Sequence, residues 1–424
     1  MTALHEGRVA GHASGHPALH RLLGDAAEGF GTSTWGRRPL LVRAADLPRD
    51  FADLLSADAV DELVSRRGLR APFLRVAKEG STLPDRRFTA GGGVGATIGD
   101  QVSDDKLVRL FADGSTMVLQ GLHRTWPALV EFSQQLAGEL GHPVQVNAYV
   151  TPPQNRGFDD HYDVHDVFVL QVEGEKRWRL HEPVHPRPLR DQPWTAHRAA
   201  VEAEAAREPL LDTVLAPGDC LYLPRGYLHA ATALGGVSTH LTIGIHPWTR
   251  HAMADQLLRA ALADLADDED VRASLPFGTR VEDPAATADD LELVRARLLR
   301  AVEAVDAARV AAPLAAQARA NQRAEPVGPL AQLRAAEALD AGGPPDDLVL
   351  RRWLSGSLVP RTDGADGAVL RSRAGDVLLG ADDVDAVTAL LDGADGAVAA
   401  LPTDLALPTD LARRLVLAGV LVPR

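Results

Sequence analysis

The sequence predicts a mainly β central domain with helices on either side, and three observations support this. Between residues 115 and 246, short apolar stretches of strand length follow one another, with one helical pattern near 127–140. Turn sequences containing Gly and Pro separate them, and long helices do not alternate with them. After Trp248 the apolar spacing becomes helical. We therefore expect a β-sandwich or barrel rather than a parallel α/β sheet.

Each apolar stretch of the central region is interpreted as one strand. The predicted strands are 116–120, 144–151, 167–172, 177–180, 219–223 and 239–245. Glu173–Glu175 is predicted to be the turn between the third and fourth of these strands, and Ala216–Asp219 marks another turn. From Leu22 to about Arg70, short helical patterns alternate with turns marked by Pro.

At 424 residues the chain is long enough for two or three domains. The helical patterns at 251–267 and 289–311 are typical of a dimerising layer or of a helical cap on the same monomer. The end of the chain reads as helix, helix and strand, which is a winged-helix-like pattern. We expect a flexible lead-in over 1–20, a β-rich domain over 21–248, a helical region over 249–343 and an α+β domain over 344–424.

Charge and composition limit the possible partners. The formal net charge of −14 argues against nucleic acid or a membrane surface, because phosphate binding needs a basic face. The predicted C-terminal helix offers only Arg413 and Arg414 among acids, so we expect no DNA contact. The single cysteine, Cys220, is typical of a reducing compartment, and the sequence contains no run of about 20 apolar residues. We therefore expect a cytoplasmic protein.

His161, Asp163 and His229 form a credible set of three metal ligands. Residues i and i+2 of a β-strand point to the same face, so His161 and Asp163 can bind one ion together. A histidine from a later strand completes two imidazoles and one carboxylate, which is the pattern of non-haem Fe(II) oxygenases. Zn(II) also accepts this set, but no nearby residue suggests itself as the general base of a hydrolase.

Three other histidines are competing ligands. His165 lies at even spacing from His161, and His240 and His246 lie on or near the last predicted strand. We prefer His229 because a Pro-Arg-Gly turn immediately precedes it. The other three are interpreted as core or neighbouring histidines, with His240 as the first substitute.

An oxygenase of this kind also needs a cation for its co-substrate. The distal carboxylate of 2-oxoglutarate must be paired when buried, because an unpaired buried charge is very costly. Lys176 can supply this cation if the predicted hairpin folds it back toward the ligands. Asn147 and Tyr149 lie two residues apart on the preceding strand and can donate hydrogen bonds to the same molecule.

Several stretches together resemble the Jumonji-C ribosomal oxygenases of the cupin superfamily, over about residues 20–246. The resembling stretches are Trp35–Val42, Asn147–Pro152, His161–Asp163, Val167–Trp178, Pro224–His229 and Ser238–Thr242. The resemblance implies a double-stranded β-helix with N-terminal helices, a helical dimerisation region and a winged-helix-like C-terminal domain. For the last two parts it extends to the architecture only.

The resemblance also assigns roles to residues. It implies Fe(II) bound by His161, Asp163 and His229, and 2-oxoglutarate held by Lys176 with Asn147, Tyr149 and Thr242 lining its pocket. With O2, the family hydroxylates an Arg or His side chain of a ribosomal protein. A basic ribosomal substrate suits an acidic enzyme, because opposite charges steer their encounter. A homodimer is implied as well.

Two departures from the family pattern leave alternatives open. Bacterial relatives that act on Arg more often carry Arg at the position of Lys176, whereas Lys resembles the eukaryotic members that modify His. The Gly91–Gly95 loop has no family equivalent that we can place. The alternatives to a protein hydroxylase are a metal-binding cupin that acts on a peptide or small molecule, and a non-catalytic interaction protein.

Overall fold

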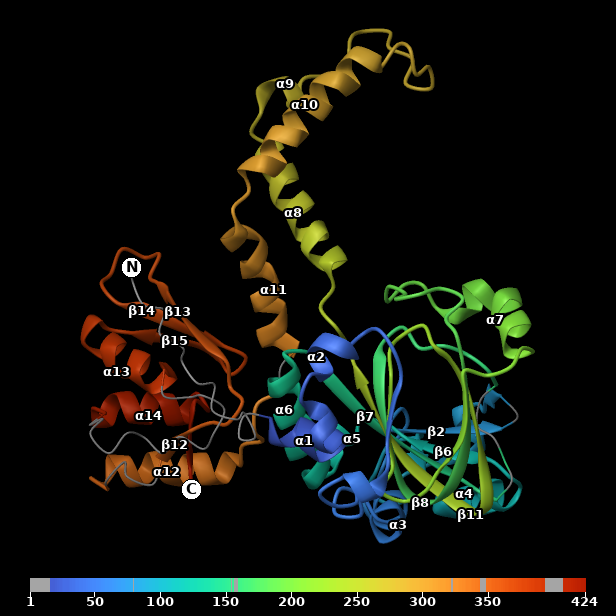
Figure 1. The fold of residues 1–424 in the computed structure, drawn as a ribbon. Helices are drawn as coiled ribbons and strands as arrows, with labels where there is room; N and C mark the ends of the chain where they lie inside the picture. The colour runs from blue at the N-terminus through green and yellow to red at the C-terminus, as the bar shows by residue number, and fades with distance from the viewer. Residues whose placement is uncertain are drawn as a thin grey trace, which may run out of the picture. The chain divides into compact units, whose positions relative to one another are not determined.

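The computed structural model describes residues 16–78, 80–153, 155, 159–321, 323–343, 348–392 and 407–424. The chain divides into two compact units between Pro247 and Trp248. Each unit is described by itself (Figure 1). No helix in these ranges is both long enough and apolar enough to cross a bilayer.

A nine-stranded antiparallel sheet forms the centre of the first unit, as the sequence predicted. Its strands follow the order β1-β10-β8-β11-β7-β6-β2-β3, and β9 also pairs with β8. A small hairpin of β4 and β5 lies outside this sheet. The strands are β1 (Leu40–Val42), β2 (Leu74–Lys78), β3 (Ser81–Thr82), β4 (Thr89–Ala90), β5 (Gln101–Val102), β6 (Thr116–Leu119), β7 (Val144–Thr151), β8 (Asp166–His181), β9 (Leu211–Leu215), β10 (Cys220–Leu223) and β11 (Leu228–Ile245).

Alternation along the strands gives the sheet two different faces. On β7, Val146, Ala148 and Val150 lie in the main hydrophobic core, which the N-terminal helices cover. The residues between them therefore point to the opposite face, because successive side chains alternate. This opposite face carries the polar side chains of the candidate site.

The helices of the first unit are short, apart from α6. Pro127 begins α6 at a position where a missing N–H costs nothing, and Gly141 ends it in the left-handed conformation. In Figure 1, α5 and α6 lie beside β7, and α1 packs against α6. The helices are α1 (Pro17–Leu23), α2 (Phe30–Ser33), α3 (Ala57–Arg66), α4 (Asp104–Ala112), α5 (Leu122–Thr125), α6 (Pro127–Leu140) and α7 (Arg198–Ala205).

The flexible lead-in predicted over residues 1–20 is wrong at its end. Helix α1 begins at Pro17, and both Ala18 and Leu19 are buried. Their backbone N–H groups donate to the Glu139 carboxylate at 2.9 and 2.8 Å, which stabilises the start of this helix. Residues 1–15 lie outside the described ranges.

The predicted turn at Glu173–Glu175 is also wrong. Residues 166–181 form one continuous strand, β8, and Gly174 lies inside it with φ of +62°. A Cβ at Gly174 would lie 2.0 Å from the carbonyl oxygen of Val237 on β11. The glycine therefore permits a close approach of two strands where their register shifts, and makes no hairpin.

The second unit begins with helices whose apolar faces are exposed. The predicted helix 289–311 is two helices, because the backbone is extended at Val305 and the Asp306 side chain accepts from the N–H of Arg309 at 2.9 Å. Arg309 also pairs with Asp264 of α8 at 2.7 Å. The helices are α8 (Arg250–Leu265), α9 (Glu269–Arg272), α10 (Ala288–Ala304) and α11 (Ala307–Asn321).

A separate hydrophobic core unites the C-terminal elements. Gln332 is buried and donates to the carbonyls of Val416 and Leu421 at 2.7 and 2.8 Å. The predicted C-terminal helix and strand are present as α14 and β16, and the winged-helix designation stays a prediction. The elements are α12 (Pro329–Asp340), β12 (Leu348–Leu350), β13 (Gly356–Pro360), β14 (Ala368–Ser372), β15 (Gly375–Leu379), α13 (Ala381–Asp392), α14 (Thr409–Leu417) and β16 (Leu421–Pro423).

Candidate metal centre and co-substrate cavity

His161, Asp163 and His229 lie together on the polar face of the sheet. One ligand atom from each lies within 4.8 Å of the others, and no other group of this kind occurs in the described ranges. The His161 and His229 rings are 4.4 Å apart, and Asp163 Oδ2 is 3.8 Å from His229 Nε2. Two imidazoles and one carboxylate on one side of a cavity suit an ion with open positions.

The backbone brings the two histidines together in a way that the sequence did not predict. His161 and Asp163 precede β8 and are not part of a regular strand. His161 instead forms an isolated antiparallel bridge with His229, through N–H to carbonyl bonds of 3.2 and 2.8 Å. The first and third candidate ligands are therefore fixed opposite each other by two hydrogen bonds.

Backbone carbonyls also orient the two rings. The Nδ1 of His161 donates to the Asp159 carbonyl at 2.7 Å, and the Nδ1 of His229 donates to the Tyr227 carbonyl at 3.1 Å. Each Nδ1 must carry the proton, because a carbonyl oxygen only accepts. The Nε2 atoms therefore carry no proton, and each offers its lone pair to a metal, as is usual for ligating histidines.

The protonation states of the ligands favour metal binding. Burial, together with the nearby His161, lowers the pKa of His229 to about 4, so the ring is neutral at pH 7. Burial alone would raise the pKa of Asp163, but the neighbouring His165, His229 and His161 lower it. A neutral imidazole and an ionised carboxylate are the forms that bind a cation.

A buried carboxylate holds the turn that precedes His229. Asp166 accepts from the Tyr222 hydroxyl at 2.6 Å and from the Arg225 N–H at 3.1 Å. The next N–H, of Gly226, donates to the Asp163 carbonyl at 3.0 Å. The Pro-Arg-Gly turn is therefore tied both to the start of β8 and to the segment that carries Asp163.

The three ligands line a cavity of about 250 Å³. Its remaining walls come from five strands and from the loop before α7. The lining residues are Arg75, Thr116, Tyr149, His161, Asp163, Val167, Val169, Lys176, Trp178, Trp194, His229, Ala230, Ala231, His240 and Thr242.

Lys176 reaches this cavity from the continuous strand β8. It is buried, and its Nζ donates to Thr151 Oγ1 at 3.1 Å and lies 3.4 Å from His240 Nδ1. Burial lowers the pKa of Lys176 to about 7. Within the described part of the chain no carboxylate forms an ion pair with this lysine, so an anionic ligand would supply the missing charge.

The other predicted residues fall into two groups. Tyr149 and Thr242 line the cavity, and Tyr149 stacks on His240 at 4.9 Å. Asn147 does not line it, because its side-chain oxygen accepts from the Gly121 N–H at 3.2 Å.

The three competing histidines also fall into two groups, according to whether they line the cavity. His240 lines the cavity behind the ligands and is not one of the three that could share an ion. His165 and His246 contact each other, with ring centroids 5.2 Å apart, and neither lines the cavity. The preference for His229 over these three as a ligand agrees with the geometry.

The cavity residues that sequence reasoning missed include Arg75, Trp178 and Trp194. Arg75 lies between buried Leu74 and Val76 on β2, and an arginine flanked by core residues is a signal that could have found it. Trp178 stacks near His229 at 6.0 Å. Trp194 lies 6.4 Å from His161, in a loop with no recognisable pattern.

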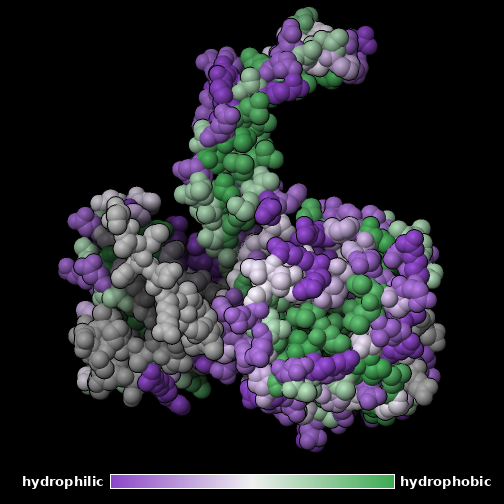
Figure 2. Space-filling view, viewed as in Figure 1, coloured by the Kyte–Doolittle hydropathy of each residue, from purple (hydrophilic) through white to green (hydrophobic). Residues whose placement is uncertain are grey.

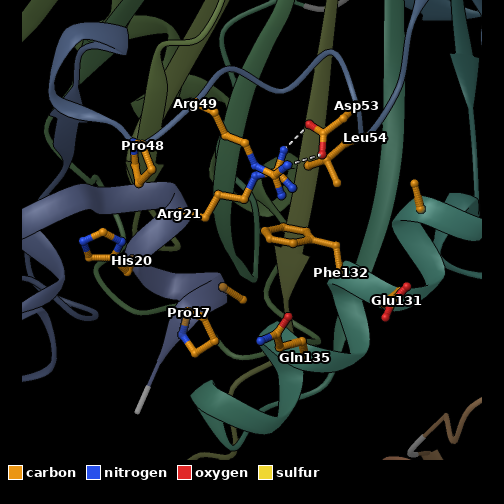
Figure 3. A pocket seen from close by; sticks show the side chains of 12 residues that line it. Pro17, His20, Arg21, Pro48, Arg49, Asp53, Leu54, Glu131, Phe132 and Gln135 are labelled. Carbon is orange, nitrogen blue, oxygen red and sulfur yellow. Dashed lines mark hydrogen bonds and ion pairs between the residues drawn. The ribbon is translucent and has the colours of Figure 1, made fainter. Parts of the chain in front are cut away.

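A second cavity of about 520 Å³ lies near α1 and α6, and it contains no group of metal ligands (Figure 3). Arg21 and Arg49 both pair with the Asp53 carboxylate there. The guanidinium of Arg21 also lies 5.3 Å from the ring of Phe132. These contacts pair a largely buried guanidinium with a carboxylate and connect N-terminal segments, which is a structural role.

The chain is similar to known proteins in part of its sequence and in its fold. Residues 125–253 match the family described as JmjC domain. The chain resembles the X-ray structure of ycfD from E. coli with a TM-score of 0.55 and 17% identity, covering 94% of this chain and 98% of that one. A second structure of that protein, described as a ribosomal oxygenase, gives a TM-score of 0.51 at 15% identity, with the same coverage. Residues 125–253 are therefore similar to the JmjC domain family, and the fold of the chain is similar to that of the ycfD structures.

Curated relatives are similar over part of the chain. The chain is 31% identical over 258 residues to ribosomal oxygenase 1 of Gallus gallus, covering 59% of this chain and 40% of that protein. It is 30% identical over 233 residues to the bifunctional lysine-specific demethylase and histidyl-hydroxylase NO66 of Drosophila grimshawi, covering 54% and 31%. The chain thus spans about a third of the length of these relatives.

Proposed function

We propose that the chain is an Fe(II)- and 2-oxoglutarate-dependent oxygenase that hydroxylates a side chain of a protein. The observation that carries this proposal is the pairing, in one cavity, of a two-histidine, one-aspartate centre with a buried lysine that has no counter-ion among the described residues. The relatives named above as ribosomal oxygenase and histidyl-hydroxylase support it, as does a structure of YcfD in complex with cobalt and 2-oxoglutarate.

The residues divide the work between them. His161, Asp163 and His229 would hold the iron, and Lys176 would bind the distal carboxylate of 2-oxoglutarate. Bound iron and 2-oxoglutarate supply the oxidising chemistry with O2. Tyr149 stays protonated at neutral pH, because burial and then Asp163 raise its pKa to about 12. One part of the cavity wall is apolar and helps to exclude water, because it is formed by Val167, Val169 and Trp178.

We also propose a basic ribosomal protein as the target, and the cytoplasm as the place of action. The net charge of −14 would attract such a protein. Direct DNA binding is not part of the proposal, because Arg413 pairs with Asp340, and Arg414 with Asp383 and Asp410. Both arginines of α14 are thus already neutralised.

A homodimer through the helical region, residues 249–343, belongs to the same proposal. Side chains that would normally be covered are exposed, among them Met253, Leu258 and Leu262 on α8 and Leu291 and Leu299 on α10. Figure 2 shows apolar residues gathered over α8 and α11. A monomer by light scattering at micromolar concentration would contradict dimerisation.

The test begins with anaerobic Fe(II) reconstitution of the full chain, followed by succinate release from 2-oxoglutarate with and without ribosomal-protein extract. We expect stimulation by the extract and a product heavier by one oxygen atom. His161→Ala should lose metal and turnover while keeping its fold, whereas His20→Ala, at an exposed position on α1 outside this cavity, should keep metal and turnover. Failure of the wild-type protein to bind 2-oxoglutarate would refute the oxygenase and leave a metal-binding cupin.

A further inference from the structure

Arg75 occupies a regular position on the cavity face of the sheet. It pairs with Val118 on β6, which pairs with Tyr149 on β7, which in turn pairs with His240 on β11. Directly paired residues of antiparallel strands point to the same face. The side chain of Arg75 therefore lies in one row with two cavity residues, and it lines the cavity itself.

Part of the Arg75 guanidinium is unpaired within the described part of the chain. Its Nε is buried and donates to nothing, and no ion pair to Arg75 occurs in the described ranges. Arg70, five residues earlier, shows the usual alternative, since it pairs with Asp100 at 2.7 Å. Buried polar groups are nearly always hydrogen-bonded, so an unpaired donor in a cavity indicates a missing ligand. The Nε1 of Trp178 is a second unpaired donor on the same wall.

Arg75 and Lys176 serve different parts of the cavity. Lys176 contacts Thr151 and His240. Arg75 instead enters the cavity from β2, and the strands β11, β7 and β6 separate β2 from β8, which carries Lys176, in the sheet order. A bound 2-oxoglutarate would use Lys176 at one end and the metal at the other. Arg75, which neither of these contacts uses, would then contact the target side chain.

The charges around the cavity limit which kinds of target side chain can bind there. Among the described residues, its lining contains two cations outside the histidines, Arg75 and Lys176, and one carboxylate, Asp163. Asp163 is committed to the metal. A target arginine or lysine would thus meet the like charge of Arg75 with no free anion, which is unfavourable in a partly dry site.

We propose that Arg75 is a specificity-determining residue, which donates hydrogen bonds to a neutral acceptor on the target side chain and excludes arginine and lysine. This inference rests on the proposed function. Among the side chains that the family modifies, it selects neutral histidine over arginine.

The experiment uses the full chain loaded with Mn(II) and 2-oxoglutarate at pH 8, where imidazole is neutral. The probes are the N-acetyl amides of histidine, glutamine and arginine, and the readout is broadening of their proton NMR lines by the bound Mn(II). Wild-type protein should bind the two neutral probes at least about tenfold more tightly than the arginine probe. Arg75→Met should remove this preference, and Arg75→Lys should still exclude the arginine probe.

Arg70→Met is the matched control, because it removes an arginine outside the cavity, and it should keep the wild-type preference. Equal or tighter binding of the arginine probe by wild-type protein would overturn the proposal, as would an unchanged preference in Arg75→Met. The glutamine probe separates hydrogen bonding from direct ligation of the metal by imidazole. If 2-oxoglutarate does not bind, the proposed function fails, and the same comparison with Mn(II) alone still decides the role of Arg75.

Discussion

Replacing Lys176 by methionine should stabilise the ligand-free protein and at the same time abolish co-substrate binding. Lys176 is buried, and its ammonium group has a hydroxyl and an imidazole as hydrogen-bond partners but no anion. The difference between a pKa of 10.5 and about 7 corresponds to roughly 5 kcal/mol of unfavourable free energy for the charged form. Methionine has a similar length and carries no charge.

The size of this effect depends on pH with a defined sign. The folded pKa of Lys176 is lower than the unfolded one, so the penalty is complete below about pH 7 and absent above about pH 10.5. At pH 7 it is about 4 kcal/mol, and at pH 9.5 about 1.5 kcal/mol. Losing the bond to Thr151 offsets about 1 kcal/mol of the gain.

The assay is urea unfolding of wild-type and Lys176→Met protein at both pH values, followed by tryptophan fluorescence, together with calorimetric titration of 2-oxoglutarate. We expect the variant to be more stable by about 3 kcal/mol at pH 7. Its affinity for 2-oxoglutarate should fall by a factor of about 100 or more, because a buried carboxylate loses its partner. A stability difference that does not change with pH, or a variant that still binds 2-oxoglutarate, would refute this reasoning.

Three further predictions concern the same site. The affinity of wild-type protein for 2-oxoglutarate should fall about 25-fold from pH 6.5 to 8.5, because binding needs the ammonium form of Lys176, whose pKa is about 7. This pH dependence should disappear in Lys176→Arg, and calorimetric titration at both pH values measures it. Asp166→Asn should cost about 2–4 kcal/mol of unfolding free energy and weaken metal binding, since Asp166 holds the turn before His229. The control is Asp212→Asn at an exposed position, which breaks only a surface pair with Arg177 and should cost less than about 1 kcal/mol. An equal cost for both variants would argue against the role of the turn. Gly174→Ala should cost about 3 kcal/mol of unfolding free energy in thermal or urea unfolding, because its Cβ would clash with the Val237 carbonyl. Gly235 has a similar positive φ but open space around it, so Gly235→Ala should cost only about 1 kcal/mol. A similar loss of stability in both variants would show that the clash is not the cause.

Much of the fold could be predicted because local patterns and tertiary structure agree. Strand β7 and helix α6 have the predicted bounds, since alternation and helical spacing, with Pro at the start of α6 and Gly after it, specify them locally. The continuity of β8 could not be predicted. A glycine between two glutamates usually indicates a turn, and only the carbonyl of Val237 on a distant strand shows that Gly174 permits a close approach instead.

The sequence by itself determined which residue types could hold a metal and a carboxylate. His161, Asp163, His229 and Lys176 carry the donors and the charge that such ligands need, whatever the path of the chain. Only the tertiary structure decided how they meet, through the bridge between His161 and His229 and the register of the sheet. It also placed Arg75 in the cavity and turned Asn147 toward Gly121. The physical reason is that a side chain's type sets what it can bind, whereas strand pairing between distant segments sets what it can reach.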